Sequence, residues 1–233
     1  MKCFDFIFES LLNIIFPPLC VVCKIALAEG VACGPCLLKI PLNKTFFCAL
    51  CGARIPGTKK ICHPQAPYLL GAAGPYDNAT LKLLVRNLKF RGMRRAAEPL
   101  AALIAQYLTD IKIDVSGYLL IPLPLSRRRK NERGFNQAEE IAKHLAERLP
   151  VELKTDILMR IRHTKPQTET GNVAERRLNV LGCFAVAQQG SVAGKNIILL
   201  DDVTTSGATL GEAAHALKNR GARNIIGIAA AKA

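Results

Sequence analysis

The sequence predicts an α/β fold in which helices flank a mostly parallel sheet and a small cysteine-rich domain precedes that sheet. The first observation behind this prediction is an apolar run at 197–200 that ends abruptly in Asp201 and Asp202. Such a run is typical of a strand buried on both faces, as in parallel sheets. The second observation is the confinement of seven of the nine cysteines to residues 20–62. With 233 residues, the chain can bury one substantial core plus a small appendage.

Residues 1–16 are rich in Phe, Ile and Leu, a composition that calls for a test against secretory signals. Asp5 and Glu9 interrupt the apolar run, no small-residue cleavage site follows, and Pro17-Pro18 ends it. The segment is also too short to span a bilayer. We therefore expect a short amphipathic helix packed on a cytoplasmic protein without stable membrane insertion. Transient membrane contact is the alternative.

Residues 17–67 are expected to form a zinc-ribbon domain. Two C-x-x-C pairs, Cys20/Cys23 and Cys33/Cys36, offer the four thiolates of a complete tetrahedral site. A segment of this size with little hydrophobic core needs a cross-link such as a bound metal ion in order to fold. A disulfide framework would need an oxidising compartment, which the lack of a recognisable signal disfavours. A redox C-x-x-C is normally a single motif in a βαβ setting.

A second zinc site is less complete. Cys48 and Cys51 form a third C-x-x-C pair and Cys62 follows, but Gln65 stands where the fourth cysteine would be. His63 is the remaining candidate, in an awkward position directly beside Cys62. The second site is therefore Cys3His-like, weak or lost, and we expect one or two structural zinc ions. Pairing in sequence order is the default, and interleaved pairing of the first knuckle with the third stays open.

From residue 68 to 233 the cysteine pairs stop and a different domain is expected. Apolar periodicity predicts, in order, a strand at 70–76, helices at 79–90 and 96–111, a strand at 118–121, a helix at 138–148, a strand at 196–200 and a helix at 210–220. Pro122 and Pro124 forbid a central strand from continuing beyond residue 121. Gly221 is the expected stop of the last helix.

The formal net charge of +14 is gathered into clusters of lysine and arginine. They lie at 86–95, 127–133, 160–165 and 176–177. A field of this sign suits polyphosphate substrates and nucleic acid. With four Tyr and no Trp, stacking on single-stranded bases is not especially indicated. We expect basic loops at 126–137 and 160–167, and the second of these could order over a diphosphate.

The residues after the last apolar run suit a sugar phosphate. Backbone N–H groups of 203–209, the positive end of a helix dipole and hydroxyl side chains can surround a phosphate monoester without a formal cation. The hydroxyls belong to Thr204, Thr205, Ser206 and Thr209. Gly207 lets the backbone approach closely, and Asp201 and Asp202 can accept the vicinal hydroxyls of a ribose. The chain has no G-x-x-x-x-G-K-[ST] string, which excludes a P-loop nucleotidase.

Residues 196–210 resemble the motif with which type I phosphoribosyltransferases bind phosphoribosyl diphosphate (PRPP). Nearly the whole chain further resembles the ComF family of competence-associated phosphoribosyltransferase-like proteins. The features that carry this resemblance are the cysteine knuckles, Ile121-Pro122-Leu123-Pro124, Arg133-Gly134-Phe135-Asn136-Gln137, the 164–167 loop with Arg176 and Asn179, and the PRPP motif, in that order. The resemblance implies a type I phosphoribosyltransferase-like sheet behind a zinc-ribbon head. Gln65 departs from a complete double zinc ribbon.

The resemblance implies an enzyme that transfers a phosphoribosyl group from PRPP to an unidentified acceptor and releases diphosphate, with Mg2+ accompanying PRPP. The implied catalytic residues are Arg133, Arg162 and Lys165. The implied substrate-binding residues are Pro122, Leu123, Pro124, Asn136, Gln137, Gln167, Arg176, Asp201, Asp202, Thr204, Thr205, Ser206, Gly207, Ala208 and Thr209.

Two other functions stay open. Some proteins with this fold bind PRPP as a signal without turning it over, and the family is tied to the handling of incoming DNA. The runner-up is therefore a non-catalytic PRPP-sensing or DNA-binding factor in natural transformation. Its partners would be single-stranded DNA and a competence helicase, and a homodimer is compatible with either function. A purely structural zinc adaptor ranks last because it leaves 201–209 unexplained.

Overall fold

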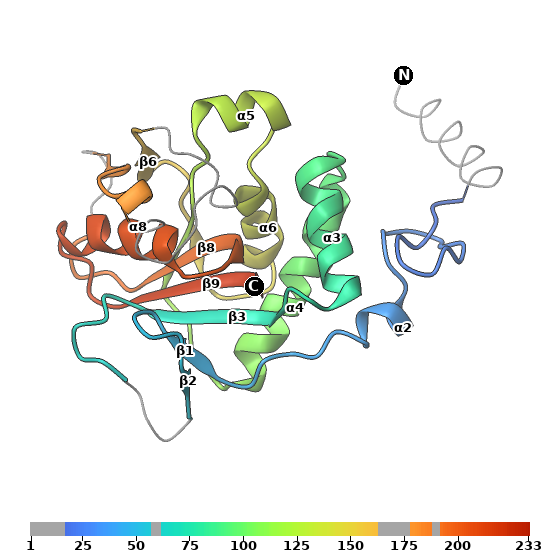
Figure 1. Cartoon of the computed structure of the whole chain (residues 1–233), viewed down its shortest axis with the longest axis horizontal. Coiled ribbons are helices and arrows are strands. Elements are labelled where there is room, and N and C mark those ends of the chain that lie inside the picture. Colours follow the sequence, from blue (N-terminus) through green and yellow to red (C-terminus); the bar gives the residue numbers. More distant parts are fainter. Residues whose placement is uncertain (1–16, 57–61, 163–177, 188–191) are drawn as a thin grey trace.

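The computed structural model describes residues 17–56, 62–162, 178–187 and 192–233 (Figure 1). The helix expected at 1–16 and the candidate residues Lys165, Gln167 and Arg176 lie outside these ranges. Among the helices inside them, none has the length and apolar character needed to cross a membrane.

A seven-stranded sheet runs through the molecule in the order β2-β1-β3-β9-β8-β4-β5 (Figure 1). Its parallel strands are β3 (Leu69–Pro75), β9 (Ile225–Lys232), β8 (Ile197–Thr204), β4 (Leu119–Pro122) and β5 (Glu152–Leu153). Helices lie in the connections from β3 to β4, from β4 to β5 and from β8 to β9, as is usual between parallel strands. The predicted α/β fold with a mostly parallel sheet is confirmed.

Both faces of the sheet are covered because the central strands are apolar on both sides. The first face carries α3 (Ala79–Phe90), the short 3-10 helix η1 (Arg94–Ala96), α4 (Ala97–Asp110) and α6 (Gln137–Ala146). The second face carries α8 (Ala208–Lys218) and the antiparallel pair β6 (Leu158–Arg160) and β7 (Phe184–Val186). In β8, Ile198 and Leu200 face the first layer, and Ile197 and Leu199 face the second. All four are fully buried, so the predicted doubly buried strand is confirmed.

Two short strands of the cysteine-rich segment extend one edge of the sheet. They are β1 (Phe46–Cys48) and β2 (Arg54–Ile55), and α2 (Gly34–Leu37) precedes them. β1 pairs antiparallel with β3, with Phe47 opposite Leu70 and Cys48 opposite Leu69. Backbone hydrogen bonds therefore join the cysteine-rich segment to the rest of the sheet. The division into domains at 17–67 and 68–233 remains a proposal.

Several elements differ from the expectation. β4 includes Pro122, which pairs with Leu200 of β8, although the prolines were expected to end this strand at residue 121. β5, β6 and β7 are strands that the sequence did not predict. β8 continues through both aspartates to Thr204 instead of ending at residue 200. The stretch expected as a basic loop contains a helix, α5 (Arg127–Arg133), which begins after the Ser126 cap and ends at Gly134 with φ 75°. β9 was not predicted, because its alanine-rich composition is not typical of strands. The helix predicted at 79–90 is confirmed as α3, and the other helix boundaries shift by a few residues.

Candidate substrate site and metal-ligand groups

Predicted site residues from several elements come together at the carboxyl edge of the parallel strands. Pro122 of β4 pairs with Leu200 of β8, and the Leu123 N–H donates to the Leu200 carbonyl at 2.8 Å. The Asn136 side-chain amide donates to the Leu123 carbonyl at 3.0 Å. The turn after β4 and the start of α6 therefore adjoin the end of β8. Open α/β sheets bind ligands at such an edge.

Asp201 and Asp202 belong to β8 and point to opposite faces of the sheet, because side chains alternate along a strand. Asp202 points toward α3, where the Lys89 ammonium lies 2.8 Å from its Oδ1. The side chains of Asp202 and Lys89 are only 8% and 20% exposed. The sequence did not predict a site role for Lys89, because this residue is one of several cations on the polar face of an amphipathic helix.

Asp201 is electrostatically different from its neighbour. Burial and the adjacent charge of Asp202 raise the pKa of Asp201 to about 7, against the opposing effect of Lys89. The Asp202 backbone N–H donates to Asp201 Oδ1 at 2.8 Å. At neutral pH the Asp201 carboxyl is therefore divided between charged and neutral forms. A nearby bound cation would favour the charged form.

Arg133, at the end of α5, is held within electrostatic reach of both acids. Its Nη1 donates to Gln137 Oε1 at 2.8 Å, and its guanidinium carbon lies 5.5 Å from the centroid of the Phe90 ring. Burial lowers the pKa of Arg133, while the charges of Asp202 and Asp201 counteract this effect. The site thus contains a partly desolvated, oriented guanidinium.

A second arginine near Asp201 comes from β6 and was not predicted. Burial lowers the pKa of Arg160, the charge of Arg129 lowers it further, and Asp201 acts in the opposite direction. Arg162, the predicted residue two positions later, donates from Nη1 to the Leu181 carbonyl at 3.4 Å. Arg160 is the last residue of β6, whereas Arg162 follows the strand.

The loop between β8 and α8, which we call the phosphate loop (205–209), offers donors to an anion. Gly207 has φ 74° and is the cap of α8, which begins at Ala208. Ser206 Oγ is buried and has no hydrogen-bond partner among the described residues, and the same holds for Gln137 Nε2 at the start of α6. Buried polar groups are nearly always paired in native proteins. A bound ligand with acceptor oxygens would satisfy both atoms.

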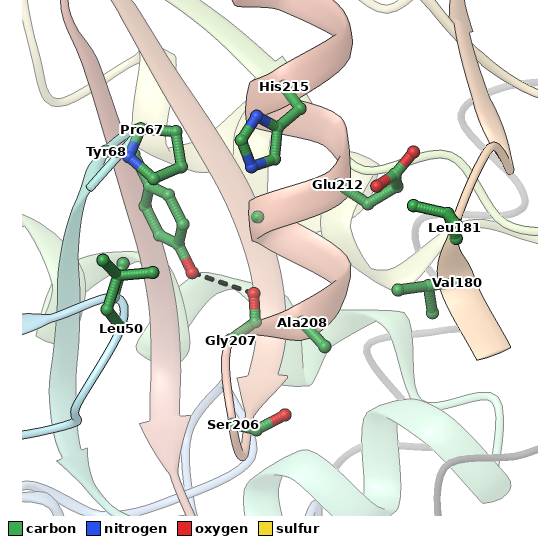
Figure 2. A pocket seen from close by; sticks show the side chains of 12 residues that line it. Leu50, Pro67, Tyr68, Val180, Leu181, Ser206, Gly207, Ala208, Glu212 and His215 are labelled. Atoms are coloured by element: carbon green, nitrogen blue, oxygen red, sulfur yellow. Dashed lines mark hydrogen bonds between the residues drawn. The ribbon is translucent and has the colours of Figure 1, made fainter. Parts of the chain in front are cut away.

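Tyr68 contacts the phosphate loop from the side of the cysteine-rich segment. Its hydroxyl donates to the Gly207 carbonyl at 2.8 Å, and the residue is 5% exposed (Figure 2). A cavity of about 220 Å³ adjoins the ring and is bordered by Leu50, Leu181 and Glu212, among others. Nothing in the sequence marked Tyr68, because its partner lies far away along the chain.

The first cysteine group contains Cys20, Cys23, Cys33 and Cys36, whose sulfurs lie within 4.8 Å of one another. Burial raises the pKa of Cys20, but surrounding backbone N–H groups outweigh burial and lower it to about 6. The hydrogen bond with Cys33 is the main cause that raises the pKa of Cys36 to about 12. Four thiols so close cannot all ionise without a compensating cation. The donor set therefore fits a tetrahedral metal ion such as zinc.

The second cysteine group contains Cys48, Cys51, Cys62 and His63, again within 4.8 Å of one another. His63 Nδ1 lies 3.3 Å from Cys48 Sγ, and the sulfurs of Cys51 and Cys62 are 3.7 Å apart. The expectation that His63 is awkwardly placed is wrong, because it and Cys62 reach the same point from adjacent positions. The knuckles pair in sequence order and not in the interleaved way. His63 thus offers a fourth donor atom where Gln65 offers no thiolate.

Comparison with known proteins adds a domain assignment. The family described as Phosphoribosyl transferase domain matches residues 133–232, a range that begins at Arg133 and contains the acid pair and the phosphate loop. Among solved structures, hypoxanthine phosphoribosyl transferase of Trypanosoma cruzi is 13% identical over 59% of this chain and 64% of its own, with a TM-score of 0.35.

Several relatives are similar beyond that domain. Competence protein F of Haemophilus influenzae is 28% identical over 218 residues, which are 88% of this chain and 93% of its own length. DNA utilization protein YhgH of Escherichia coli O157:H7 is 28% identical over 219 residues, 90% of this chain and 94% of its own. Competence protein ComFC of Bacillus subtilis is 32% identical over 144 residues, 62% of this chain and 56% of its own.

The domain match, these relatives and the two amino-terminal ligand groups agree with one another along the chain. Along most of its length the chain is similar to the ComF and YhgH proteins of competence and DNA utilization, and its residues 133–232 match the phosphoribosyl transferase domain.

Proposed function

We propose that this protein binds PRPP at the carboxyl edge of its sheet and transfers the phosphoribosyl group to an acceptor with release of diphosphate. The observation that carries the proposal is the acid pair Asp201–Asp202 directly ahead of the phosphate loop, in which Ser206 Oγ is buried without a described partner. Acceptors for a diol beside donors for a phosphate monoester complement a ribose 5-phosphate.

The 5-phosphate would lie against the phosphate loop and the first turn of α8. Ser206 Oγ and the backbone N–H groups that open α8 would donate to its oxygens, and the helix dipole favours the negative charge there. The loop has no lysine or arginine of its own. Recognition would therefore depend on the direction of the N–H groups, which the backbone conformation at Gly207 sets.

The ribose hydroxyls would donate to the two carboxylates. The ammonium of Lys89 lies 2.8 Å from Oδ1 of Asp202. A carboxylate has about four lone-pair positions on its two oxygens, so Asp202 can accept a hydroxyl while it keeps Lys89. Asp201, with its pKa raised to about 7, would gain charge as a cation approaches with the substrate.

The diphosphate would face the turn 122–124 and the start of α6. Arg133, oriented by Gln137 and by the Phe90 ring, would stabilise the charge that builds up on the departing diphosphate. Gln137 Nε2 would donate to one of its oxygens. Mg2+, when bound with PRPP, would neutralise the diphosphate and ease its departure.

The reaction breaks the bond between the anomeric carbon and the diphosphate oxygen, and the bonding electrons leave with diphosphate. A lone pair of the acceptor forms the new bond at the same carbon. Positive charge develops on the sugar ring, where the carboxylates of Asp201 and Asp202 would stabilise it. The roles of Arg162, Lys165, Gln167 and Arg176 over the diphosphate remain part of this proposal.

Calorimetric titration of PRPP, with and without Mg2+, tests the binding step. We expect saturable binding by the wild type and a decrease of at least about tenfold in affinity for Asp202→Asn, since a charge-assisted hydrogen bond contributes about 1.5–3 kcal/mol. Asp114→Asn, an exposed acid before β4, is the matched control and should bind as the wild type does. A diphosphate-release screen over nucleobases then separates turnover from binding. A wild type that binds no PRPP in either condition would refute the site.

A second candidate function, DNA binding, is favoured by the surface of α5. Arg127, Arg128 and Lys130 lie on this helix and are exposed to solvent. One relative is named a DNA utilization protein. The two functions are compatible, because the exposed cations of α5 would contact DNA while Arg133 and the acid pair would contact PRPP.

The two cysteine groups would each hold a structural zinc ion. Each group offers a tetrahedral number of thiolate or imidazole donors, which is what zinc prefers. Cysteine ligands for zinc need reduced thiols, which persist in reducing compartments, and we therefore propose a cytoplasmic location.

A further inference from the structure

We propose that Tyr68 positions the phosphate loop and couples it to the second cysteine group, Cys48, Cys51, Cys62 and His63. The inference rests on the proposed PRPP site, because the loop that it concerns is the one that would hold the 5-phosphate. It gives the second cysteine group a regulatory role in PRPP binding, in addition to its role in stabilising the fold.

The Tyr68 ring lies in a slot that three glycines leave open. A Cβ at Gly227 of β9 would come within 2.7 Å of the ring, and one at Gly207 within 2.4 Å of its hydroxyl oxygen. On α8, a Cβ at Gly211 would lie 3.6 Å from the ring. The ring is therefore packed between β9 and the start of α8.

The hydroxyl end of Tyr68 acts on the residue that sets the geometry of the loop. The Gly207 carbonyl accepts both the Tyr68 hydroxyl and the N–H of Gly211, each at 2.8 Å. Gly207 also has φ 74°, which glycine adopts at low cost. A buried phenol thus fixes the peptide at which the phosphate loop passes into α8.

The backbone end of Tyr68 is fixed by the second cysteine group. Cys48 is the last residue of β1, and it pairs with Leu69, the residue directly after Tyr68. From the other side the chain reaches Tyr68 through a turn in which the Ala66 N–H donates to the His63 carbonyl at 3.0 Å. A metal ion shared by Cys48 and His63 would hold both approaches to Tyr68 together.

These contacts form a continuous path from the metal ligands to the phosphate loop. Closure of the ligand group fixes the start of β3, the start of β3 fixes the Tyr68 ring, and the ring fixes Gly207. If the closed group favours the loop conformation that binds a phosphate, PRPP must favour retention of the metal to the same degree, because such coupling is reciprocal.

The variant Tyr68→Phe tests this proposal, since it keeps the ring in its slot and removes only the hydroxyl. Tyr107→Phe is the matched control. Tyr107 is also fully buried, and its hydroxyl also donates to a backbone carbonyl, that of Thr45 at 2.9 Å, but it lies on α4 against the other face of the sheet. Both variants lack one equivalent hydrogen bond, so a general decrease in stability affects them alike.

Two measurements on the zinc-loaded proteins decide the outcome. By calorimetry, Tyr68→Phe should bind PRPP about three- to tenfold more weakly, the range expected from one hydrogen bond, and Tyr107→Phe should bind within about twofold of the wild type. In a chelator assay, PRPP should slow the release of one zinc ion from the wild type and from Tyr107→Phe, but not from Tyr68→Phe. Without PRPP, release should be faster from Tyr68→Phe than from Tyr107→Phe.

Equal PRPP affinities for the two variants would overturn the positioning role. Equal zinc-release rates, with and without PRPP, would overturn the coupling. A wild type that binds no PRPP would instead remove the proposed function, and the release rates without PRPP would still decide whether Tyr68 supports the second cysteine group.

Discussion

Lys89 of α3 and Asp202 of β8 form an ion pair, with 2.8 Å between the ammonium nitrogen and Oδ1. Because of this ion pair, Asp201 and Asp202 have different electrostatic surroundings. Asp202 has a direct cationic partner, whereas Asp201 has a pKa raised to about 7 by burial and by the charge of Asp202. The protonation of Asp201 therefore responds to pH and to ligands.

Replacement of Lys89 by methionine should destabilise the protein. It leaves Asp202 buried without its partner, which costs several kcal/mol for a fully buried charge and about 2 kcal/mol for this partly exposed pair. Urea unfolding of Lys89→Met measures the effect. Lys82→Met is the control, because Lys82 lies two turns earlier on the same helix and is exposed. A Lys89→Met protein no less stable than the control would show that the pair contributes nothing.

The stability of the protein should depend on pH through Asp201. Its pKa is raised in the folded state, so the folded protein keeps a proton that the unfolded chain releases above about pH 4. The stabilisation is complete below the unfolded pKa and is lost as pH rises toward 7, by at most about 1.4 kcal/mol per pH unit. Denaturant unfolding at several pH values between 5 and 8 should show this decline.

Asp201→Asn should flatten the decline in that window, because asparagine does not titrate. Asp156→Asn, an exposed acid outside the site, should leave the slope unchanged. Subtraction of variant from wild type also removes the pH dependence of the thiol ligands, which is common to both proteins. Identical slopes for wild type and Asp201→Asn would contradict the raised pKa.

Elemental analysis should find two zinc ions per chain, one for each cysteine group. Cys33→Ser should lose one ion and Cys62→Ser the other, with a lower melting temperature in both cases, because metal binding contributes to folding. Cys183→Ser is the control, since this buried cysteine belongs to neither group. A zinc-free wild type with an unchanged melting curve would contradict both sites.

Arg133 and the exposed cations of α5 should act on different ligands. Arg133→Ala should weaken PRPP binding, because its guanidinium is half-buried near the acid pair. The double variant Arg127→Ala/Lys130→Ala should keep PRPP affinity and bind DNA more weakly, with the salt dependence reduced by roughly one unit of slope for each phosphate that the variant no longer neutralises. Titrations of both ligands across a salt series make the comparison. If the double variant is weakened in PRPP affinity alone, the DNA-binding role of α5 is wrong.

The elements predicted correctly from the sequence are those whose apolar pattern is strong and local. The helix at 79–90 and the strand before Asp201 are examples, since spacing and burial agree there. α5 was missed because it has no buried face and is defined by its Ser126 cap and by Gly134. β9 was missed because small residues replace β-branched ones along much of it. At Gly227 the reason for the small residue is tertiary packing, since the Tyr68 ring occupies the space that a side chain would fill.

The residues of the candidate site likewise fall into two groups, those that the sequence predicts and those that only the tertiary structure reveals. Contiguous residues such as the acid pair and the phosphate loop could be read from the chain, because one strand–loop–helix unit contains them. Lys89, Arg160 and Tyr68 could not, since each reaches the site from another element and their roles depend on tertiary packing. His63 was judged by its sequence neighbour, whereas the direction of its side chain decides its role.

The pairing of β3 has a consequence for the nascent chain. One edge of β3 pairs with β1, which is synthesised shortly before it, and the other pairs with β9, which is synthesised long after it. While the intervening helices emerge, β3 has a partner on one side only, and an unpaired strand edge invites association with other chains. Early zinc capture by the second cysteine group would keep the first edge covered during this interval, so zinc supply during translation should affect the yield of folded protein.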